Sequence, residues 1–143
     1  MMHGRRWVTG LLIIAGLLSS ACAAVAEDEG ALHDPATLEP IAGSDVSRVT
    51  LTEEAAVRLD IEVDSVLSAG SATTIPYAAV FYTATGETWT YTSPEPLTFV
   101  RVPIVVDHIR GDDVFLSDGP PSGMDVVTQG AAELYGTETG VEE

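Results

Sequence analysis

Residues 88–92 read Thr88-Trp89-Thr90-Tyr91-Thr92, a strict alternation of threonine with aromatic residues. Such alternation places the threonines on one face of a β-strand and the aromatic rings on the other face. The turn-forming pair Thr85-Gly86 comes just before this run, and an apolar segment, residues 75–82, comes before the turn. The pattern therefore predicts a β-hairpin built from residues 75–92.

Short segments with the composition of β-strands recur on both sides of this hairpin. The expected strands cover residues 46–51, 61–66, 97–107, 114–116 and 124–127, and residues 68–74 are expected to form a loop of small residues. Thr52-Glu53-Glu54 predicts a short helix that ends near Asp60, because a hydroxyl cap followed by acidic residues suits a helix start. Residues 130–135 are expected to add one helical turn. Short strands with turns between them predict a mainly β fold, a small β-barrel or sandwich with one short N-terminal helix.

The N-terminal segment has the order of an export signal. Arg5 and Arg6 precede an apolar run, residues 8–18, which leads to Ser19-Ser20-Ala21-Cys22. The run is shorter than the roughly 20 residues that a membrane-spanning helix needs. The arrangement resembles a bacterial lipoprotein signal peptide, although Ser19 stands where an aliphatic residue is usual. The resemblance implies that residues 1–21 are removed and that Cys22 carries the lipid. An ordinary secretory signal, cut between Ala21 and Ala26 with loss of Cys22, is the alternative.

The remaining boundaries follow from composition. Residues 22–45 are small, acidic and poor in large apolar side chains, so they are expected to form a flexible acidic linker. Residues 46–136 contain the expected strands and make up the folded β-domain. Residues 137–143 are polar and are expected to form a loose acidic tail.

Charge and cysteine content exclude several classes of function. The formal net charge is −16, and the chain contains no lysine. A chain this acidic repels phosphate backbones, so we expect no nucleic-acid partner. Its single cysteine rules out an internal disulfide and a cysteine-based zinc site.

No catalytic constellation stands out in the sequence. It has no glycine-rich phosphate loop, no nucleophile elbow and no paired-histidine metal motif. His108 lies near Asp107, Asp112 and Asp113, but these ligand types lack the spacing of a known calcium loop and are interpreted as a solvated hairpin end. We therefore expect a protein that is not an enzyme and has no metal site or cofactor.

The aromatic residues between positions 77 and 99 have two interpretations. Such clusters commonly form a core or cross-strand pairs, but they also form contact surfaces when they are exposed. On the second interpretation, the residues that contact a partner or ligand are Tyr77, Trp89, Tyr91 and Phe99.

Several stretches, taken in order, resemble one protein family. The first is Val49-Thr50-Leu51-Thr52-Glu53-Glu54-Ala55-Ala56, followed by Leu59-Asp60-Ile61 and Val66, and the second is Ile75-Pro76-Tyr77-Ala78-Ala79-Val80-Phe81-Tyr82. The order continues through residues 87–91 and 99–104 to a closing pattern in residues 111–134. This order is similar to that of periplasmic adaptor subunits, or membrane-fusion proteins, of bacterial efflux pumps. Only residues 67–74 separate the first two stretches, so the lipoyl-like domain and helical hairpin of a complete adaptor have no counterpart between them. What remains resembles the membrane-proximal β-domain.

The resemblance, together with Cys22, implies a function at the membrane. We expect an exported, lipid-anchored protein at the outer face of the cytoplasmic membrane or in the periplasm. It would be a non-enzymatic accessory component associated with the permease subunit of a transporter or efflux system. A free-standing lipoprotein that binds a small molecule or a cation is the alternative.

Overall fold

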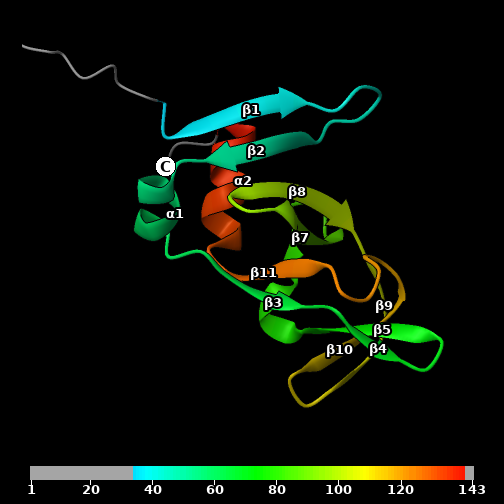
Figure 1. Cartoon of the computed structure of the whole chain (residues 1–143). Helices are drawn as coiled ribbons and strands as arrows, with labels where there is room; N and C mark the ends of the chain where they lie inside the picture. Colours follow the sequence, from blue (N-terminus) through cyan, green and yellow to red (C-terminus); the bar gives the residue numbers. More distant parts are fainter. Residues whose placement is uncertain (1–33, 141–143) are drawn as a thin grey trace, which may run out of the picture. The chain divides into compact units, whose positions relative to one another are not determined.

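The computed structural model describes residues 34–140 and has the mainly β architecture that the sequence predicts (Figure 1). Its strands form two antiparallel sheets, and each sheet is open, with two end strands. The expected signal peptide, Cys22 and the first part of the expected linker lie outside the described residues. None of the helices in residues 34–140 combines the length and the hydropathy of a membrane-spanning helix.

The larger sheet contains the alternating segment at its centre. Its strands, in spatial order, are β1 (Ala36–Pro40), β2 (Ser47–Leu51), β8 (Thr98–Pro103), β7 (Thr88–Glu95), β11 (Asp125–Gln129) and β3 (Glu62–Ser65), and the short β6 (Phe81–Tyr82) also pairs with β7. The smaller sheet has the order β4 (Leu67–Ala69), β5 (Ala72–Pro76), β10 (Asp113–Asp118) and β9 (Val105–Arg110).

Each face of the larger sheet packs against a different layer. Tyr91 and Phe99 pack against Leu134 of helix α2 (Ala131–Thr139) and Ala55 of helix α1 (Glu53–Arg58), so this side is the helix-covered face. On the opposite face, Val126 of β11 packs against residues of the smaller sheet. The central strands are therefore covered on both sides.

Helix α1 begins and ends close to the predicted positions. The backbone N–H of Ala55 donates to Thr52 Oγ1 over 3.1 Å, which caps the first turn. The helix ends at Arg58, and Asp60 then takes a left-handed conformation with φ of 53°. Aspartate tolerates this conformation better than most residues, so the chain can turn sharply into β3.

The expected linker and tail are both wrong in the part that the structure describes. Residues 36–40 form β1, which pairs with β2 from Ala36–Leu51 to Pro40–Ser47. Backbone pairing to a strand edge requires few apolar side chains, so composition gave no indication of it. Residues 137–139 belong to α2, and Glu138 is buried. The folded domain therefore starts before Val46 and continues past Gly136.

Three internal predictions also differ from the structure. Residues 68–74 are part of the β4–β5 hairpin and not a loop. A 3₁₀ helix, Tyr77–Ala79, interrupts the strand expected over residues 75–82. The strand expected over residues 97–107 breaks at Ile104, whose N–H donates to the carbonyl of Thr88 over 3.1 Å. At this break the chain leaves the larger sheet and enters the smaller one as β9.

Candidate functional site

An open groove lies beside helix α1, on the part of the helix-covered face that neither helix covers. It consists of two adjoining hollows of about 340 and 470 Å³, both lined by Ala56, Ile61 and Leu97. We call it the α1 groove. Its remaining lining residues are Ser93, Pro94, Glu95, Pro96, Phe99, Val63 and Asp125 in the first hollow and Glu53, Val57, Asp60 and Glu62 in the second.

One wall of the groove is α1 and the turn that follows it. Val57 points away from the core and has 80 % of its surface exposed. After the turn at Asp60, the N–H of Ile61 donates to the carbonyl of Ala56 over 3.1 Å. This bond closes the end of α1 and holds Ile61 against the helix. The first wall is therefore fixed by backbone hydrogen bonds.

The opposite wall is the turn between β7 and β8. Leu97 adopts φ of 60° in this turn, a conformation that leucine rarely takes. Its carbonyl accepts a hydrogen bond from the N–H of Leu51 in β2 over 2.9 Å, so the larger sheet holds the turn in this geometry. Pro94 and Pro96 flank it and restrict the backbone further. Both walls are thus preformed.

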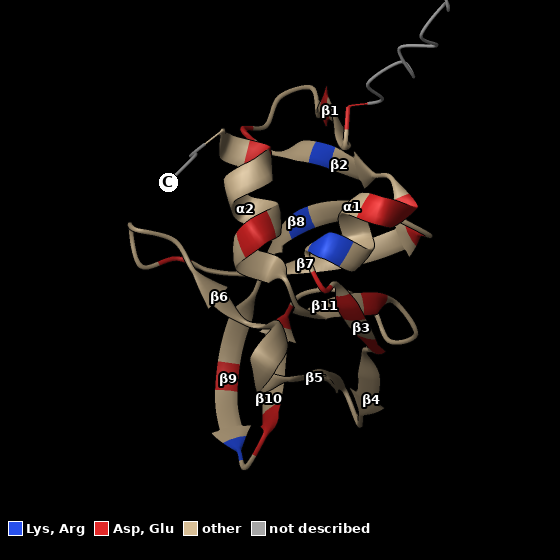
Figure 2. Cartoon of the chain, turned by 90° about the vertical axis from the view of Figure 1, so that its left-hand side faces the viewer, with Lys and Arg blue, Asp and Glu red and all other residues tan. Residues whose placement is uncertain are grey.

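The charges that line the groove all have one sign. The five charged lining residues are the acids Glu53, Asp60, Glu62, Glu95 and Asp125. Figure 2 shows acidic residues at the start of α1 and along β3. The ion pairs found within residues 34–140 involve Arg48, Arg101 and His108, and none of them includes a groove carboxylate. The groove therefore combines an apolar floor with an acidic rim.

Two of the groove carboxylates take part in hydrogen bonds within the fold. Asp60 Oδ2 accepts from Gln129 Nε2, and Asp125 Oδ1 accepts from Ser65 Oγ over 2.7 Å. These bonds tie both ends of β3 to β11. Arg58, in the last turn of α1, lines a separate hollow with Pro35 and Leu59 and is not part of the α1 groove.

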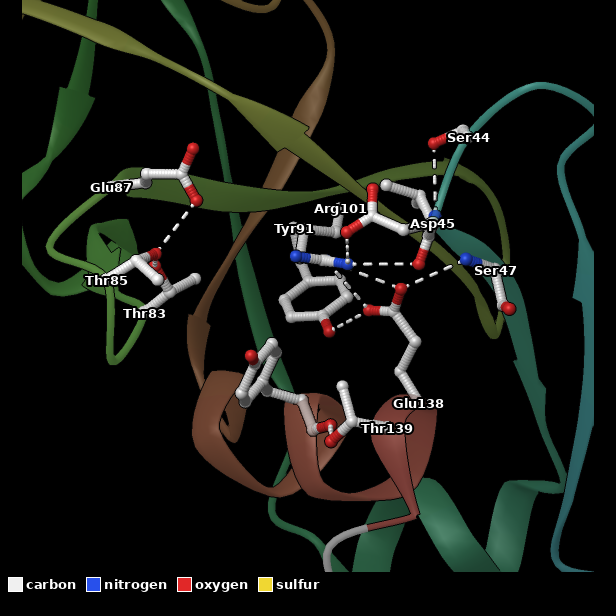
Figure 3. Close-up of polar contacts among 12 residues, drawn as sticks. Ser44, Asp45, Ser47, Thr83, Thr85, Glu87, Tyr91, Arg101, Glu138 and Thr139 are labelled. Atoms are coloured by element: carbon white, nitrogen blue, oxygen red, sulfur yellow. Dashed lines mark hydrogen bonds and ion pairs between the residues drawn. The ribbon is translucent and has the colours of Figure 1, made fainter.

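A buried polar cluster fastens α2 to the larger sheet (Figure 3). Arg101 Nε lies 3.2 Å from Glu138 Oε2, and the two side chains are 5 % and 2 % exposed. Glu138 Oε1 also accepts from the backbone N–H of Ser47 over 3.0 Å, and Oε2 accepts from the hydroxyl of Tyr91. Arg101 Nη2 donates to the carbonyl of Asp45 over 3.3 Å. The cluster thereby joins α2, β7, β8 and the residues that lead into β2.

The environment of Tyr91 keeps its hydroxyl protonated. Burial raises the pKa of Tyr91 far above its usual value, and the hydrogen bond to the Glu138 carboxylate raises it further. At neutral pH the phenol is therefore protonated and donates its hydrogen bond to Glu138. Because every member of the cluster is bonded to another protein group, we interpret the cluster as structural.

The four aromatic residues that the sequence selects as contacts differ in their exposure to solvent. Tyr91 is fully buried and Phe99 is 3 % exposed, so the contact prediction is wrong for both, although Phe99 lies at the floor of the α1 groove. Both rings lie on the face of the larger sheet that the helices cover. Trp89 is half-buried beneath the guanidinium of Arg101, 4.4 Å from the ring centroid. Tyr77 is 48 % exposed in the 3₁₀ helix, away from the other three.

The histidine hairpin is exposed. His108 Nδ1 lies 2.8 Å from Asp107 Oδ2 on β9, and the imidazole stacks on Phe115 with ring centroids 4.3 Å apart. Within residues 34–140 no three His, Cys, Asp or Glu side chains are grouped in a way that would hold a metal ion.

Sequence reasoning missed both the groove and the buried ion pair. The groove depends on a left-handed leucine and on strands that pair across long sequence separations, and the residue types do not reveal either feature. A weak signal did exist for the ion pair. Glu138 lies four residues after Leu134, so both belong to the same face of a helix, and that face is buried.

No protein-family model matches this sequence. No curated protein and no solved structure is similar to it above the level of chance. The resemblance to the membrane-proximal domain of periplasmic adaptors therefore depends on the ordered sequence motifs alone.

Proposed function

We propose that this chain is a lipid-anchored, extracytoplasmic binding protein, not an enzyme, that serves as an accessory component of a membrane transporter or efflux system. The α1 groove is the observation that carries the proposal. It is an apolar, preformed surface on a rigid β-scaffold, and a partner protein would bind there. The ordered resemblance to the adaptor β-domain supplies the class of partner, the permease subunit of a transporter.

The groove has the physical properties of a protein-binding surface. Val57 and Val63 are 80 % and 46 % exposed, so a partner would remove much of their apolar area from water. Burial of apolar surface contributes roughly 25 cal/mol for each Å². Because both walls are held by backbone hydrogen bonds, little conformational entropy would be lost on binding. An interface here would therefore retain most of the hydrophobic gain.

The anchor would assist this binding. With Cys22 lipidated, the domain would be confined to the membrane that holds the permease, and the effective concentration of each for the other would rise. Stable attachment requires about two acyl chains, which lipoprotein processing would supply at Cys22. A weak interface would then suffice for stable association.

Site-specific photo-crosslinking in native membranes tests the proposal. A photoreactive amino acid replaces Val57 in the α1 groove or, as the matched control, Ile109 on β9, which is also exposed. The full-length protein is used in both cases. We expect an adduct with a transporter subunit from position 57 and little from position 109. Equal adducts from both positions, or no transporter adduct from either, would overturn the proposal.

A thermal-shift panel separates the proposal from the alternative of a free-standing ligand-binding lipoprotein. The purified protein is heated with divalent cations and with hydrophobic small molecules. We expect melting temperatures to stay unchanged across the panel, because the groove is open on one side and its acids are not grouped around one point. A large stabilisation by one compound would favour the alternative.

A further inference from the structure

We infer that the α1 groove binds an extended, cationic segment of a partner protein, in which arginine or lysine side chains flank an aliphatic or aromatic one. This inference rests on the proposed function, because it gives the chemistry of the partner at the same groove.

Charge complementarity is the first argument. The groove acids come from separate parts of the fold, since Glu53 is on α1, Glu62 is on β3 and Glu95 is on β7. They therefore face the groove from more than one side, and no lining residue is basic. The potential in the groove is negative, so it attracts cationic groups and repels anionic ones.

The arginines of the described chain do not neutralise this potential. Arg101 is buried against Glu138, and Arg48 pairs with Glu39 at 3.5 Å. Arg58 lines the hollow on the other side of α1, and Arg110 lies at the end of β9 in the smaller sheet. The groove acids are left without a cation from residues 34–140, so a basic partner would supply the missing counter-charge.

The apolar floor shows that charge is only part of the recognition. Val57, Val63 and Leu97 present aliphatic surface between the carboxylates. A hydrated metal ion would gain nothing from such a floor, and residues 34–140 contain no grouped set of ligands for one. An apolar side chain with basic neighbours fits both parts of the surface.

The edge of the larger sheet favours an extended segment. β3 is an end strand of the larger sheet, and within residues 34–140 it pairs with β11 on one side only. Val63 and Glu62 of this strand line the groove. A segment that runs beside β3 can add backbone hydrogen bonds to the sheet while its side chains enter the groove. A helix would leave the polar backbone edge of β3 unused.

Peptide binding to the purified folded protein tests the inference. The probe is a fluorescent eight-residue peptide in which two arginines flank leucine and valine in a serine background. One control peptide has glutamate in place of arginine, and a second has serine in place of leucine and valine. Fluorescence anisotropy at low salt is expected to give binding about tenfold tighter for the probe than for either control. At high salt the advantage over the glutamate control is expected to shrink, whereas the advantage over the serine control, which keeps both arginines, is expected to persist.

Two matched protein variants locate the binding. Glu62→Gln with Glu95→Gln removes two groove charges, whereas Glu87→Gln with Glu133→Gln removes two exposed charges outside the groove lining. We expect the first variant to weaken binding about fivefold and the second to change it less than about twofold. Equal weakening by both variants would show a general attraction to the acidic protein and would overturn the inference.

Other occupants give distinct results. Equal affinity for the probe and for a free octylammonium ion would assign the groove to small amphipathic cations and would overturn the peptide assignment. A dimer in sedimentation equilibrium that the Glu62→Gln, Glu95→Gln variant strengthens would assign the groove to a second copy of the chain and would overturn the peptide assignment.

The inference and the proposed function can fail separately. A transporter adduct from position 57 without peptide binding would leave the proposed function standing and remove this inference. Peptide binding in the groove without any transporter adduct would remove the proposed function alone.

Discussion

Arg101 of β8 and Glu138 of α2 form an ion pair inside the domain, with Arg101 Nε 3.2 Å from Glu138 Oε2 and both side chains at most 5 % exposed. The Tyr91 hydroxyl and the Ser47 amide donate to Glu138, and the Asp45 carbonyl accepts from Arg101, so each member of the pair has further hydrogen-bond partners. It joins a helix near the C-terminus to strands at the centre of the larger sheet. The packing of α2 over the helix-covered face therefore depends on two buried charges that satisfy each other.

Removal of one member of this pair should destabilise the fold strongly. Glu138→Ala leaves the Arg101 guanidinium buried without its carboxylate, and losses of about 3–5 kcal/mol are usual for such changes. The double variant Arg101→Met with Glu138→Leu replaces both charges with apolar groups and should retain more stability than Glu138→Ala. Urea denaturation followed by circular dichroism compares the variants. A Glu138→Ala protein as stable as the wild type would show that the pair contributes nothing.

The stability of the domain should fall at alkaline pH because of Tyr91. The pKa of Tyr91 in the folded state is raised far above the ordinary value of 10.0, whereas the unfolded chain loses this proton near that value. Above pH 10 the unfolded state therefore gains stability that the folded state does not, and the free energy of unfolding drops by about 1.4 kcal/mol for each pH unit. Below pH 10 the contribution is fully present.

Tyr91→Phe isolates this effect. The variant keeps the ring that stacks on Phe81 with centroids 5.3 Å apart, but it has no titrating hydroxyl. Its unfolding free energy near neutral pH should be lower by about 1–3 kcal/mol, because Glu138 loses a buried hydrogen bond. Between pH 9.5 and pH 11 it should depend less on pH than that of the wild type. Identical slopes for the two proteins would contradict the assignment.

The sequence predicted local structure well, but it did not predict the α1 groove. The alternation at residues 88–92 placed β7 correctly, and the Thr52 cap placed α1, because each of these signals is contained within a few residues. The α1 groove depends on which strands become neighbours. β3 lies beside β11, although Val63 and Val127, which pair, are far apart in the sequence. No local pattern encodes such a pairing.

The aromatic residues show a second limit. The alternation correctly puts Trp89 and Tyr91 on one face of β7, but it does not say which layer covers that face. Helix α2 covers it, and the polar residues 137–139, which include Glu138, form part of that helix. The burial of Glu138 becomes intelligible only when Arg101 lies opposite, since a lone buried carboxylate would be very unfavourable. Composition therefore misassigned the tail, and the aromatic pattern misassigned Tyr91 and Phe99 as contact residues.

Gly130 should be among the positions least tolerant of substitution. It has φ of 86°, and a Cβ there would lie 2.3 Å from Ile61 Cδ1 and 2.9 Å from the carbonyl oxygen of Leu59. Gly123 has the same φ of 86° with nothing within 4 Å, so it serves as the matched control. Gly123→Ala should cost about 1–2 kcal/mol through the backbone alone. Gly130→Ala should cost more, and equal losses in thermal or urea denaturation would contradict the close approach between Gly130 and the Leu59–Ile61 segment.

Leu97 should reverse the usual order of alanine and glycine. Glycine normally destabilises a folded position relative to alanine, because the unfolded chain has more freedom to lose. At Leu97, with φ of 60°, alanine keeps the strained conformation and glycine removes the strain. Leu97→Gly should therefore be more stable than Leu97→Ala by about 1 kcal/mol in urea denaturation.

Both Leu97 variants remove the same aliphatic side chain from the wall of the α1 groove, so both should weaken binding of the arginine-containing peptide to a similar extent. If the more stable glycine variant bound the peptide as well as the wild type does, the Leu97 side chain would have no part in recognition.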